Sequence, residues 1–492
     1  MRFGFKLAIA VGVIVIGTAA AMSLRALAVG SRQIAVPPVE VAAIDAQAAA
    51  NRLAGAVRFE TISFDDRPDA SAQEFLGLHD YLARQFPLVH RTLTLEKVGQ
   101  FSLLYTWPGS DPSLKPIMLM AHQDVVPIAP GTEKDWLHDP FGGAIADGFV
   151  WGRGSWDDKS NVLAVLEALE KLVASGVVPR RTVMFASGHD EEVGGAHSAQ
   201  AIAALLKARG IRLEFVIDEG SIITEGINRN VTAPVAFIGL AEKGAVTLSL
   251  TAQATPGHSS MPPKVTAIGS LSAAVARVEN NQMPGKIAGV ARESFETLAP
   301  EMGAFNRVLL SNLWLTEPPV RSRLEEQPTT NAMLRTTTAL TVINGGDKSN
   351  VLPARAVALV NFRILPGDTV ESVERRTRET IADPSIAVAR VGSARDPSPV
   401  SPSTSDGYVL INRTIREIFP GTIVAPGLVI AGTDSRHMSE LTPNVYRFLP
   451  VRARPGDLAR FHGTNERISL ENYCELIQFF HRLIAVSSID GR

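Results

Sequence analysis

The chain of 492 residues carries 48 basic and 50 acidic residues, a formal net charge of −2. This length exceeds what one compact core usually holds, so we expect two domains. The balanced charge supplies no broad positive field, and nucleic acid is therefore not expected as a partner. Cys474 is the only cysteine, which excludes an internal disulfide and a cysteine-rich metal site. Any metal must be held by His, Asp and Glu.

An apolar N-terminal segment departs from this soluble composition. Arg2 and Lys6 precede an uncharged run from Leu7 to Leu24, which is about long enough for a helix to cross a bilayer. Small residues suited to signal cleavage follow, so residues 1–29 are predicted to be a membrane anchor or a cleaved signal, and the length favours the anchor. We expect the body of the protein outside the cytoplasm, membrane-anchored or secreted. Residues 30–42 are predicted to be a linker.

Apolar runs alternate with helical patterns in the next part of the chain, residues 43–243. Helices are predicted over 44–59, 71–85, 161–175 and 199–208, and strands over 117–121, 182–186 and 215–217. This alternation is typical of an α/β fold with a mostly parallel sheet and helices on both faces.

The pattern changes at about residue 244. Residues 244–396 are predicted to form an inserted, smaller α+β domain, and residues 397–492 return to the first domain. The insert has expected strands at 246–251 and 356–364 and helices at 267–278 and 370–381. Between them, residues 283–338 are predicted to be a helical elaboration, with a turn at Glu317-Pro318-Pro319.

Polar side chains follow the predicted strand 117–121. His122 and Asp124 are two residues apart, so strand geometry points both the same way. A carboxylate beside an imidazole is how a metal-binding histidine is oriented. The pair alone is equally typical of hydrogen-bonded structural residues.

A second cluster, Asp157-Asp158, lies in a glycine-rich turn before a helix. Helix capping explains such acids without a metal. A cation between two carboxylates would also relieve their repulsion.

Three further motifs with acidic residues or a histidine complete the pattern. Asp190, Glu191 and Glu192 follow a strand within apolar and glycine residues, Asp218 ends another strand, and His462 lies in a turn before the last helix. The carboxyl ends of parallel strands meet at one edge of a sheet. We therefore expect His122, Glu191-Glu192 and Asp218, which stand at strand ends, to converge, with one glutamate binding metal and its neighbour taking a proton from water.

The order and spacing of these motifs resemble the carboxypeptidase S and aminoacylase family of two-zinc peptidases, which includes bacterial glutamate carboxypeptidases and carnosinases. The segments 151–159, 189–195 and 432–437 are most similar to carboxypeptidase S and to secreted N-fatty-acyl amino acid hydrolases. The resemblance implies two Zn²⁺ ions. One would be bound by His122, Asp157 and Asp218 and the other by Asp157, Glu192 and His462.

The same resemblance implies roles for other residues. Glu191 would be the general base, Asp124 would orient His122, and the Asp157-Asp158 peptide bond would be cis. The insert would be a lid and dimerisation domain whose His258 reaches a neighbouring active site and stabilises an oxyanion. Asn350, Arg363 and Arg436 would contact substrate, and either arginine fits a terminal carboxylate.

The sequence thus predicts a zinc-dependent hydrolase of an amide bond next to a free carboxylate, in a short peptide or an N-acyl amino acid. A homodimer through the lid domain and a membrane contact through the N-terminal segment are the expected associations. One alternative is a membrane-anchored binding protein that has lost catalysis, but the ligands and the base are all retained. A serine hydrolase is disfavoured because no Gly-x-Ser-x-Gly motif occurs.

Overall fold

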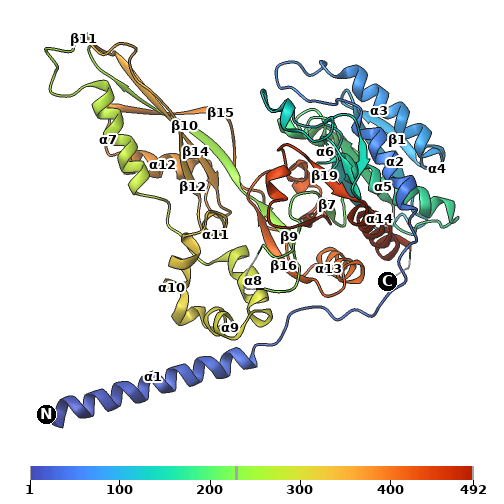
Figure 1. Ribbon diagram of the computed structural model, residues 1–492, viewed down its shortest axis with the longest axis horizontal. Coiled ribbons are helices and arrows are strands. Elements are labelled where there is room, and N and C mark those ends of the chain that lie inside the picture. The colour runs from blue at the N-terminus through green and yellow to red at the C-terminus, as the bar shows by residue number, and fades with distance from the viewer. Residues whose placement is uncertain (1, 228–230, 490–492) are drawn as a thin grey trace.

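The computed structural model describes residues 2–227 and 231–489. A larger body and a smaller, elongated one lie beside each other (Figure 1). The larger is built on a 10-stranded sheet and the smaller on a 4-stranded sheet. The smaller body reaches away from the larger one, and β11 (Gly257–His258) lies at its far end.

The large sheet has a parallel centre in which β6, β3, β7 and β17 run side by side. Antiparallel pairs flank this centre, at β1 and β2 on one side and around β9 on the other. The predicted α/β fold with a mostly parallel sheet is confirmed. In spatial order the strands are β1 (Thr94–Val98), β2 (Ser102–Trp107), β6 (Val183–Gly188), β3 (Ile117–His122), β7 (Val216–Asp218), β17 (Val445–Arg447), β9 (Val235–Glu242), β8 (Ile223–Thr224) and β18 (Arg452–Ala453), with β16 (Ile423–Val429) paired to β9.

Helices cover both faces because the central strands are apolar on both. In β3, Ile117 and Leu119 join one core cluster, whereas Met118 and Met120 join a second on the opposite face. α6 (Ala199–Ala208) packs in the second cluster. The helices that pack in the first cluster include α2 (Ala46–Val57), α3 (Ala72–Gln85), α4 (Pro87–Thr92), α5 (Lys159–Ala174), α13 (Asp406–Ile418) and α14 (Leu470–Ile484).

The smaller body, which we call the lid domain, is an antiparallel sheet with two helices on one face. Its strand order is β12 (Thr337–Asn344), β14 (Arg355–Ile364), β10 (Gly244–Gln253) and β15 (Ile386–Arg395). Alternate residues of β10, such as Val246 and Leu248, pack with α7 (Ala267–Asn280) and α12 (Val370–Ile381). At the tip, β11 pairs with β13 (Val351–Leu352). Since β10 begins two residues after β9 ends, the lid sheet is joined directly to the large sheet.

The segment predicted as a helical elaboration is helical, but one detail of the prediction is wrong. Its helices are α8 (Gly289–Leu298), α9 (Ala304–Ser311), α10 (Leu313–Glu325) and α11 (Pro328–Leu334). Pro318 and Pro319 lie inside α10 and form no turn. Each proline leaves the carbonyl four residues earlier without its helical donor. Those carbonyls belong to Trp314 and Leu315, two residues on the exposed side of the helix.

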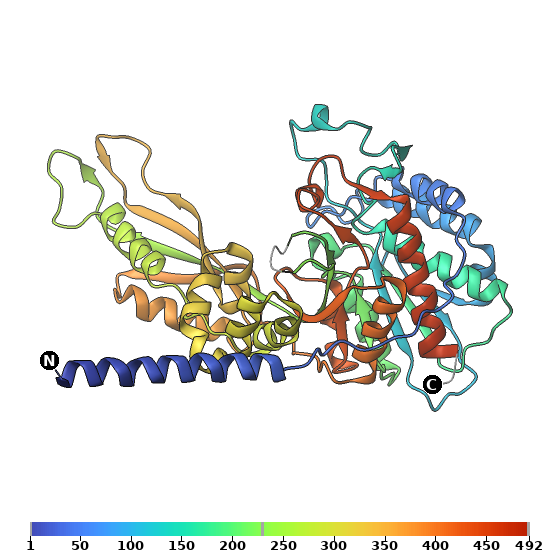
Figure 2. The same ribbon diagram turned by 60° about the horizontal axis from the view of Figure 1, so that its bottom comes forward.

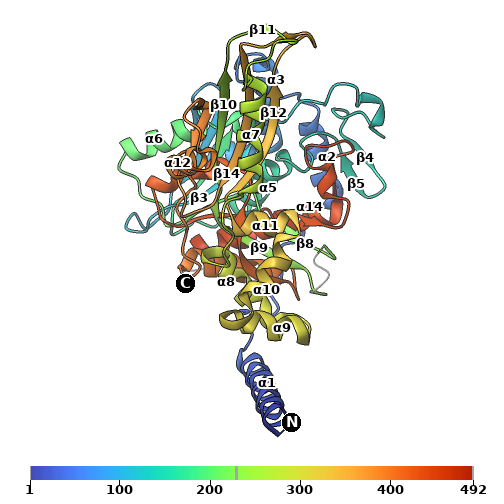
Figure 3. The same ribbon diagram turned by 90° about the vertical axis from the view of Figure 1, so that its left-hand side faces the viewer.

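The N-terminal helix α1 (Arg2–Ala28) projects from the molecule in Figure 3 and runs along the lower edge of the lid domain in Figure 2. Phe5–Ala28, with a mean hydropathy of 2.3, is the one helix in the described residues long and apolar enough to cross a membrane. Its C-terminal end contacts the helical elaboration: Asn312 Nδ2 donates to the Met22 carbonyl at 3.0 Å, and Arg307 Nε donates to that of Ala26 at 2.9 Å. Gln33, in the segment predicted as a linker, exchanges hydrogen bonds with the Val424 backbone.

Candidate metal centre

Three neighbouring parallel strands bring their carboxyl ends to one place. His122 is the last residue of β3, Asp218 is the last residue of β7, and β6 leads into the short helix Glu191–Val193. Because β6, β3 and β7 are adjacent in the sheet, these residues converge as expected. His122 and Asp218 are both buried.

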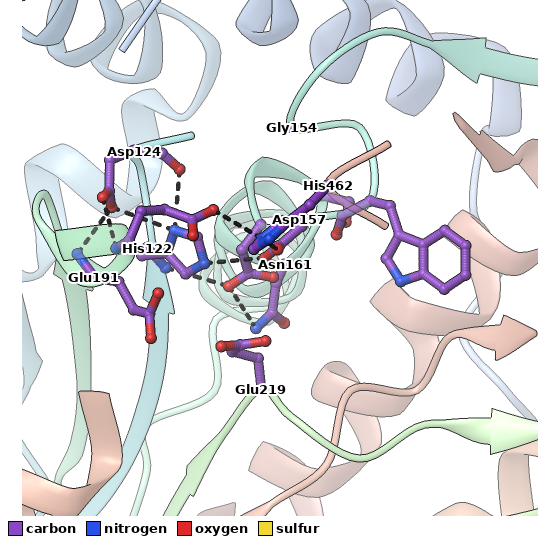
Figure 4. Close-up of polar contacts among 12 residues, drawn as sticks. His122, Asp124, Gly154, Asp157, Asn161, Glu191, Glu219 and His462 are labelled. Carbon is purple, nitrogen blue, oxygen red and sulfur yellow. Dashed lines mark hydrogen bonds and ion pairs between the residues drawn. The ribbon is translucent and has the colours of Figure 1, made fainter. Parts of the chain in front are cut away.

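Asp157 lies between two histidines (Figure 4). Its Oδ1 is 3.0 Å from His122 Nε2, and its Oδ2 is 2.9 Å from His462 Nε2. Asp157 precedes α5, and its peptide bond to Asp158 is cis. Burial alone would raise the pKa of Asp157, but its hydrogen bonds with the two histidines hold that pKa well below its usual range.

The turn that carries Asp157 is held by Glu466. One carboxylate oxygen of Glu466 accepts from the backbone N–H groups of Gly154, Trp156 and Asp157 at 2.9, 2.9 and 3.1 Å. Its other oxygen pairs with buried Arg153 at 2.5 Å. Arg153 also donates to the His462 carbonyl at 3.2 Å. One buried ion pair therefore positions both Asp157 and the distant His462 turn.

Two sets of ligand atoms share Asp157. His122, Asp157 and Glu219 form one set, and Asp157, Glu192 and His462 form the other. Within each set the ligand atoms lie within 4.8 Å of one another. Among the described residues, the structure thus brings together His122, Asp157, Glu192 and His462, four of the five residues expected to bind metal.

Glu219, the neighbour of Asp218, belongs to the first ligand set. The carboxylate of Asp218 accepts hydrogen bonds from the backbone N–H groups of Ser435 at 2.7 Å and Glu219 at 2.9 Å. The side chain of Glu219 points toward Asp157 (Figure 4). Burial raises the pKa of both acids and the charge of His122 opposes this shift, but only Glu219 belongs to a ligand set with His122 and Asp157 among the described residues.

Asp124 contacts both His122 and the turn at Glu191-Glu192. Its Oδ1 is 3.3 Å from His122 Nδ1, and its carboxylate accepts from the N–H groups of Glu191 at 3.2 Å and Glu192 at 3.0 Å. Ser63 donates a further bond at 2.6 Å. Burial would raise the pKa of Asp124, but the hydrogen bond with His122 leads the contacts that lower it. His122 Nδ1 also lies 3.0 Å from the Asp124 backbone carbonyl, so the carboxylate and the carbonyl of Asp124 together fix the His122 ring.

The centre concentrates negative charge that a cation would offset. Burial first, and then neighbouring carboxylates, raise the pKa of Glu219 well above its usual range. Glu191 and Asp434 show the same direction of shift with burial as its first cause. Glu192 Oε1 is buried, and it lies 3.3 Å from His462 Nε2. Mutually repelling buried carboxylates beside two histidines fit metal ligation.

Glu191 faces the same space as the ligand sets but belongs to neither. In Figure 4 its carboxylate and that of Glu219 point toward each other below His122. This position leaves Glu191 free to exchange a proton with a water molecule next to the two sets.

The residues expected to contact substrate do not all lie at the metal centre, because most of them belong to the lid domain. Arg436 lies beside the centre, but its guanidinium donates to the carbonyls of Thr433 at 2.7 Å and Gly194 at 2.5 Å, so it supports the turn after Glu192. Arg363 lies on lid strand β14. His258 and Asn350 are both exposed at the lid tip, where Ser259 N–H donates to the Asn350 carbonyl at 3.1 Å. His258 Nδ1 lies 2.8 Å from Ser260 Oγ.

Sequence reasoning missed three residues. Glu219 was passed over although it adjoins Asp218, because a single sequence does not reveal which of two neighbouring acids faces inward. Glu466 lies in the His462–Glu466 motif, and its spacing from His462 was the available signal. Glu242 pairs with buried Arg447 at 2.7 Å and accepts from the Thr433 N–H at 2.9 Å, which no local pattern indicated.

Comparison with known proteins agrees with this geometry. Residues 118–486 match peptidase family M20/M25/M40. The chain is 44% identical over 442 residues to N-fatty-acyl-amino acid synthase/hydrolase PM20D1.1 of Danio rerio, covering 88% of this chain and 84% of that protein. It is 32% identical over 485 residues to carboxypeptidase S of Saccharomyces cerevisiae, covering 88% and 83%.

Among solved structures, an M20 family metallo-carboxypeptidase from Sulfolobus solfataricus superposes with a TM-score of 0.63 at 17% identity, covering 89% of this chain and 98% of that one. Human carnosine dipeptidase 1 superposes with a TM-score of 0.59 at 18% identity, and the match covers 89% of this chain and 95% of that one. At these identities the structural likeness shows the fold.

Proposed function

We propose that this chain, which belongs to peptidase family M20/M25/M40, hydrolyses an amide bond next to a free carboxylate in a metal-dependent reaction. It would act as a carboxypeptidase on short peptides or as an amidohydrolase on N-acyl amino acids. The observation that carries the proposal is the pair of ligand sets that share Asp157. Relatives named for both activities support it.

Two Zn²⁺ ions fit the donor set. His122, Asp157 and Glu219 would hold one ion, and Asp157, Glu192 and His462 the other, so Asp157 would be the bridge and Glu219 replaces Asp218 in the expected assignment. Imidazole and carboxylate are suitable ligands for zinc. When bound, such ions polarise a carbonyl oxygen and make a nucleophile available from water near neutral pH.

The protein itself supplies orientation and proton transfer. Asp124 holds the His122 ring, and Glu466 holds the backbone on either side of the centre. Glu191 takes the proton of the attacking water and delivers it to the leaving amine. Burial raises the pKa of Glu191 well above its usual range, which suits a group that must hold a proton between the two steps.

The lid domain supplies substrate contacts. Arg363 would bind the terminal carboxylate, because the Arg436 guanidinium already donates to two backbone carbonyls. His258 and Asn350 would act from the lid tip of a second copy, since the tip of the same chain lies far from the centre (Figure 1). The enzyme would therefore work as a homodimer through the lid domain.

Helix α1 supports a membrane-anchored or secreted enzyme whose body lies outside the cytoplasm. An anchored enzyme would meet substrates with long acyl chains at the bilayer. Equal turnover of long-acyl and short-peptide substrates by the purified full chain would contradict this preference.

Metal removal and reloading test the reaction. Chelator treatment should abolish hydrolysis, and Zn²⁺ should restore it with about two ions bound per chain. Glu219→Gln should lose one ion, whereas the matched variant Asp218→Asn should keep both. Full activity after complete metal removal would refute the proposed mechanism, and loss of an ion from Asp218→Asn alone would return the ligand role to Asp218.

A further inference from the structure

Two arginines lie on one face of the lid sheet next to the catalytic body. Ala245 of β10 pairs with Arg363 of β14 on one side and with Arg395 of β15 on the other. Residues directly opposite one another across strands share a face of the sheet. Strand spacing therefore puts the two Cα atoms about 10 Å apart, with only the small side chain of Ala245 between them.

Arg395 reaches from the lid domain to the loop that precedes Arg436. Its guanidinium lies so close to Gly432 that a methyl group there would collide with it, and Arg436 Nη1 would lie 3.3 Å from the same methyl position. This loop continues to Ser435, whose N–H donates to Asp218. The Arg395 guanidinium is thus positioned on the catalytic side of the domain junction.

Neither lid arginine is paired. Within residues 2–227 and 231–489, no hydrogen bond or ion pair involves the guanidinium of Arg363 or Arg395. Arg447, by contrast, is paired with Glu242. Burial first, and then the charge of Arg436, lower the pKa of Arg395, while Glu242 and Glu191 act in the opposite direction. A partly buried cation without a partner is unfavourable, and an anion bound there would relieve this cost.

We propose that Arg395 binds a second anionic group of the substrate, so that the enzyme prefers an acidic side chain on the amino acid whose carboxylate Arg363 binds. This inference rests on the proposed function. The two carboxylates of a glutamate are separated by three carbons and lie about 5 Å apart. Two long arginine side chains that start about 10 Å apart can converge on such a pair.

Matched substrates test the assignment. N-acyl-glutamate and N-acyl-glutamine have nearly the same shape and differ by one charge. A charge-assisted hydrogen bond predicts that the wild-type kcat/KM favours glutamate by about tenfold to a hundredfold. Arg395→Leu should bring this ratio close to one, and Arg395→Lys should retain part of it. Arg363→Leu should lower kcat/KM for both substrates by the same factor, because both substrates carry the terminal carboxylate.

Arg390→Leu is the control. Arg390 lies on the same strand, but it pairs with Glu374 at 2.8 Å on the lid surface, so its loss should leave the ratio at the wild-type value. A wild-type ratio near one, or an unchanged ratio in Arg395→Leu, would overturn the proposal. An equal loss on both substrates in Arg395→Leu would also overturn it, since Arg395 would then bind the terminal carboxylate.

Calorimetry with free glutamate and glutamine separates this inference from the proposed reaction. The zinc-loaded full chain should bind glutamate more tightly by the same factor, and Arg395→Leu should remove the difference. If neither acyl substrate is hydrolysed but this selectivity is present, the anion site stands and the proposed reaction fails. Equal binding of the two amino acids by the wild type would refute the site.

Discussion

The metal centre and the lid tip differ in how completely one chain assembles them. Around Asp157, histidines and carboxylates from distant segments are buried and joined by hydrogen bonds of 2.9 to 3.3 Å. At the tip, His258 and Asn350 are exposed, His258 lies beside Ser260 of its own loop, and the Asn350 carbonyl accepts from Ser259 of the facing loop. A preorganised centre needs no partner to form. The tip residues lie far from the centre of their own chain (Figure 1), so their proposed role depends on a second copy.

The largest expected effect concerns the centre itself. Glu191→Gln removes the proposed base and should lower kcat by about 10² to 10⁴-fold, the usual contribution of general base catalysis. Metal content measured by elemental analysis should stay at the wild-type level, because Glu191 belongs to neither ligand set. Loss of metal together with activity would make Glu191 a ligand.

A second test asks whether buried pairing stabilises the catalytic body more than surface pairing stabilises the lid. The charge of Arg447 opposes the effect of burial and lowers the pKa of Glu242. Arg447→Met would leave that buried carboxylate unpaired, and we expect a loss of about 3 to 5 kcal/mol in urea unfolding. Arg390→Met on the lid surface should cost about 0 to 1 kcal/mol. Equal losses of unfolding free energy in the two variants would show that the buried pair does not stabilise the protein more than the surface pair.

The tip is tested by complementation. His258→Ala should lower kcat by about 10² to 10³-fold, the range measured for the loss of one oxyanion donor. Mixing His258→Ala chains with Glu191→Gln chains should restore activity, because a mixed dimer has one centre with an intact base and an intact histidine from the other copy. Two inactive variants that stay inactive when mixed and shown to form mixed dimers would place His258 in its own chain's site.

The smallest effect lies at the junction of the two bodies. Lys243 Nζ donates to the carbonyls of Ala332 at 2.9 Å and Arg335 at 2.8 Å. Burial, and then the charge of Arg363, lower the pKa of Lys243 from 10.5 to about 8. Between these values the unfolded chain holds a proton that the folded chain has lost. Stability should therefore rise with pH by up to about 1.4 kcal/mol per unit relative to Lys243→Met.

Urea unfolding of both proteins from about pH 7.5 to 10 measures this difference. Parallel stability curves for the wild type and Lys243→Met would show that the two carbonyls keep Lys243 protonated throughout.

The sequence by itself determined the α/β class and most of the centre. Buried strands such as Ile117–His122 are apolar at every position up to the functional residue, and this pattern can be recognised within a short stretch of sequence. His122, Asp157, Glu192 and His462 could be predicted because parallel strand ends must meet and because their spacing resembles a known family.

The tertiary structure decided what local patterns leave open. Asp218 and Glu219 are chemically similar neighbours. The Asp218 carboxylate accepts a hydrogen bond from the backbone N–H of Ser435, 217 residues away, whereas Glu219 belongs to the ligand set with His122 and Asp157. Pro318 and Pro319 lie within helix α10, next to the exposed residues Trp314 and Leu315. Arg395 approaches Gly432 only through the pairing of β15 with β10. In each case the deciding contact joins segments far apart in sequence or depends on solvent exposure, and neither is encoded in a short stretch of residues.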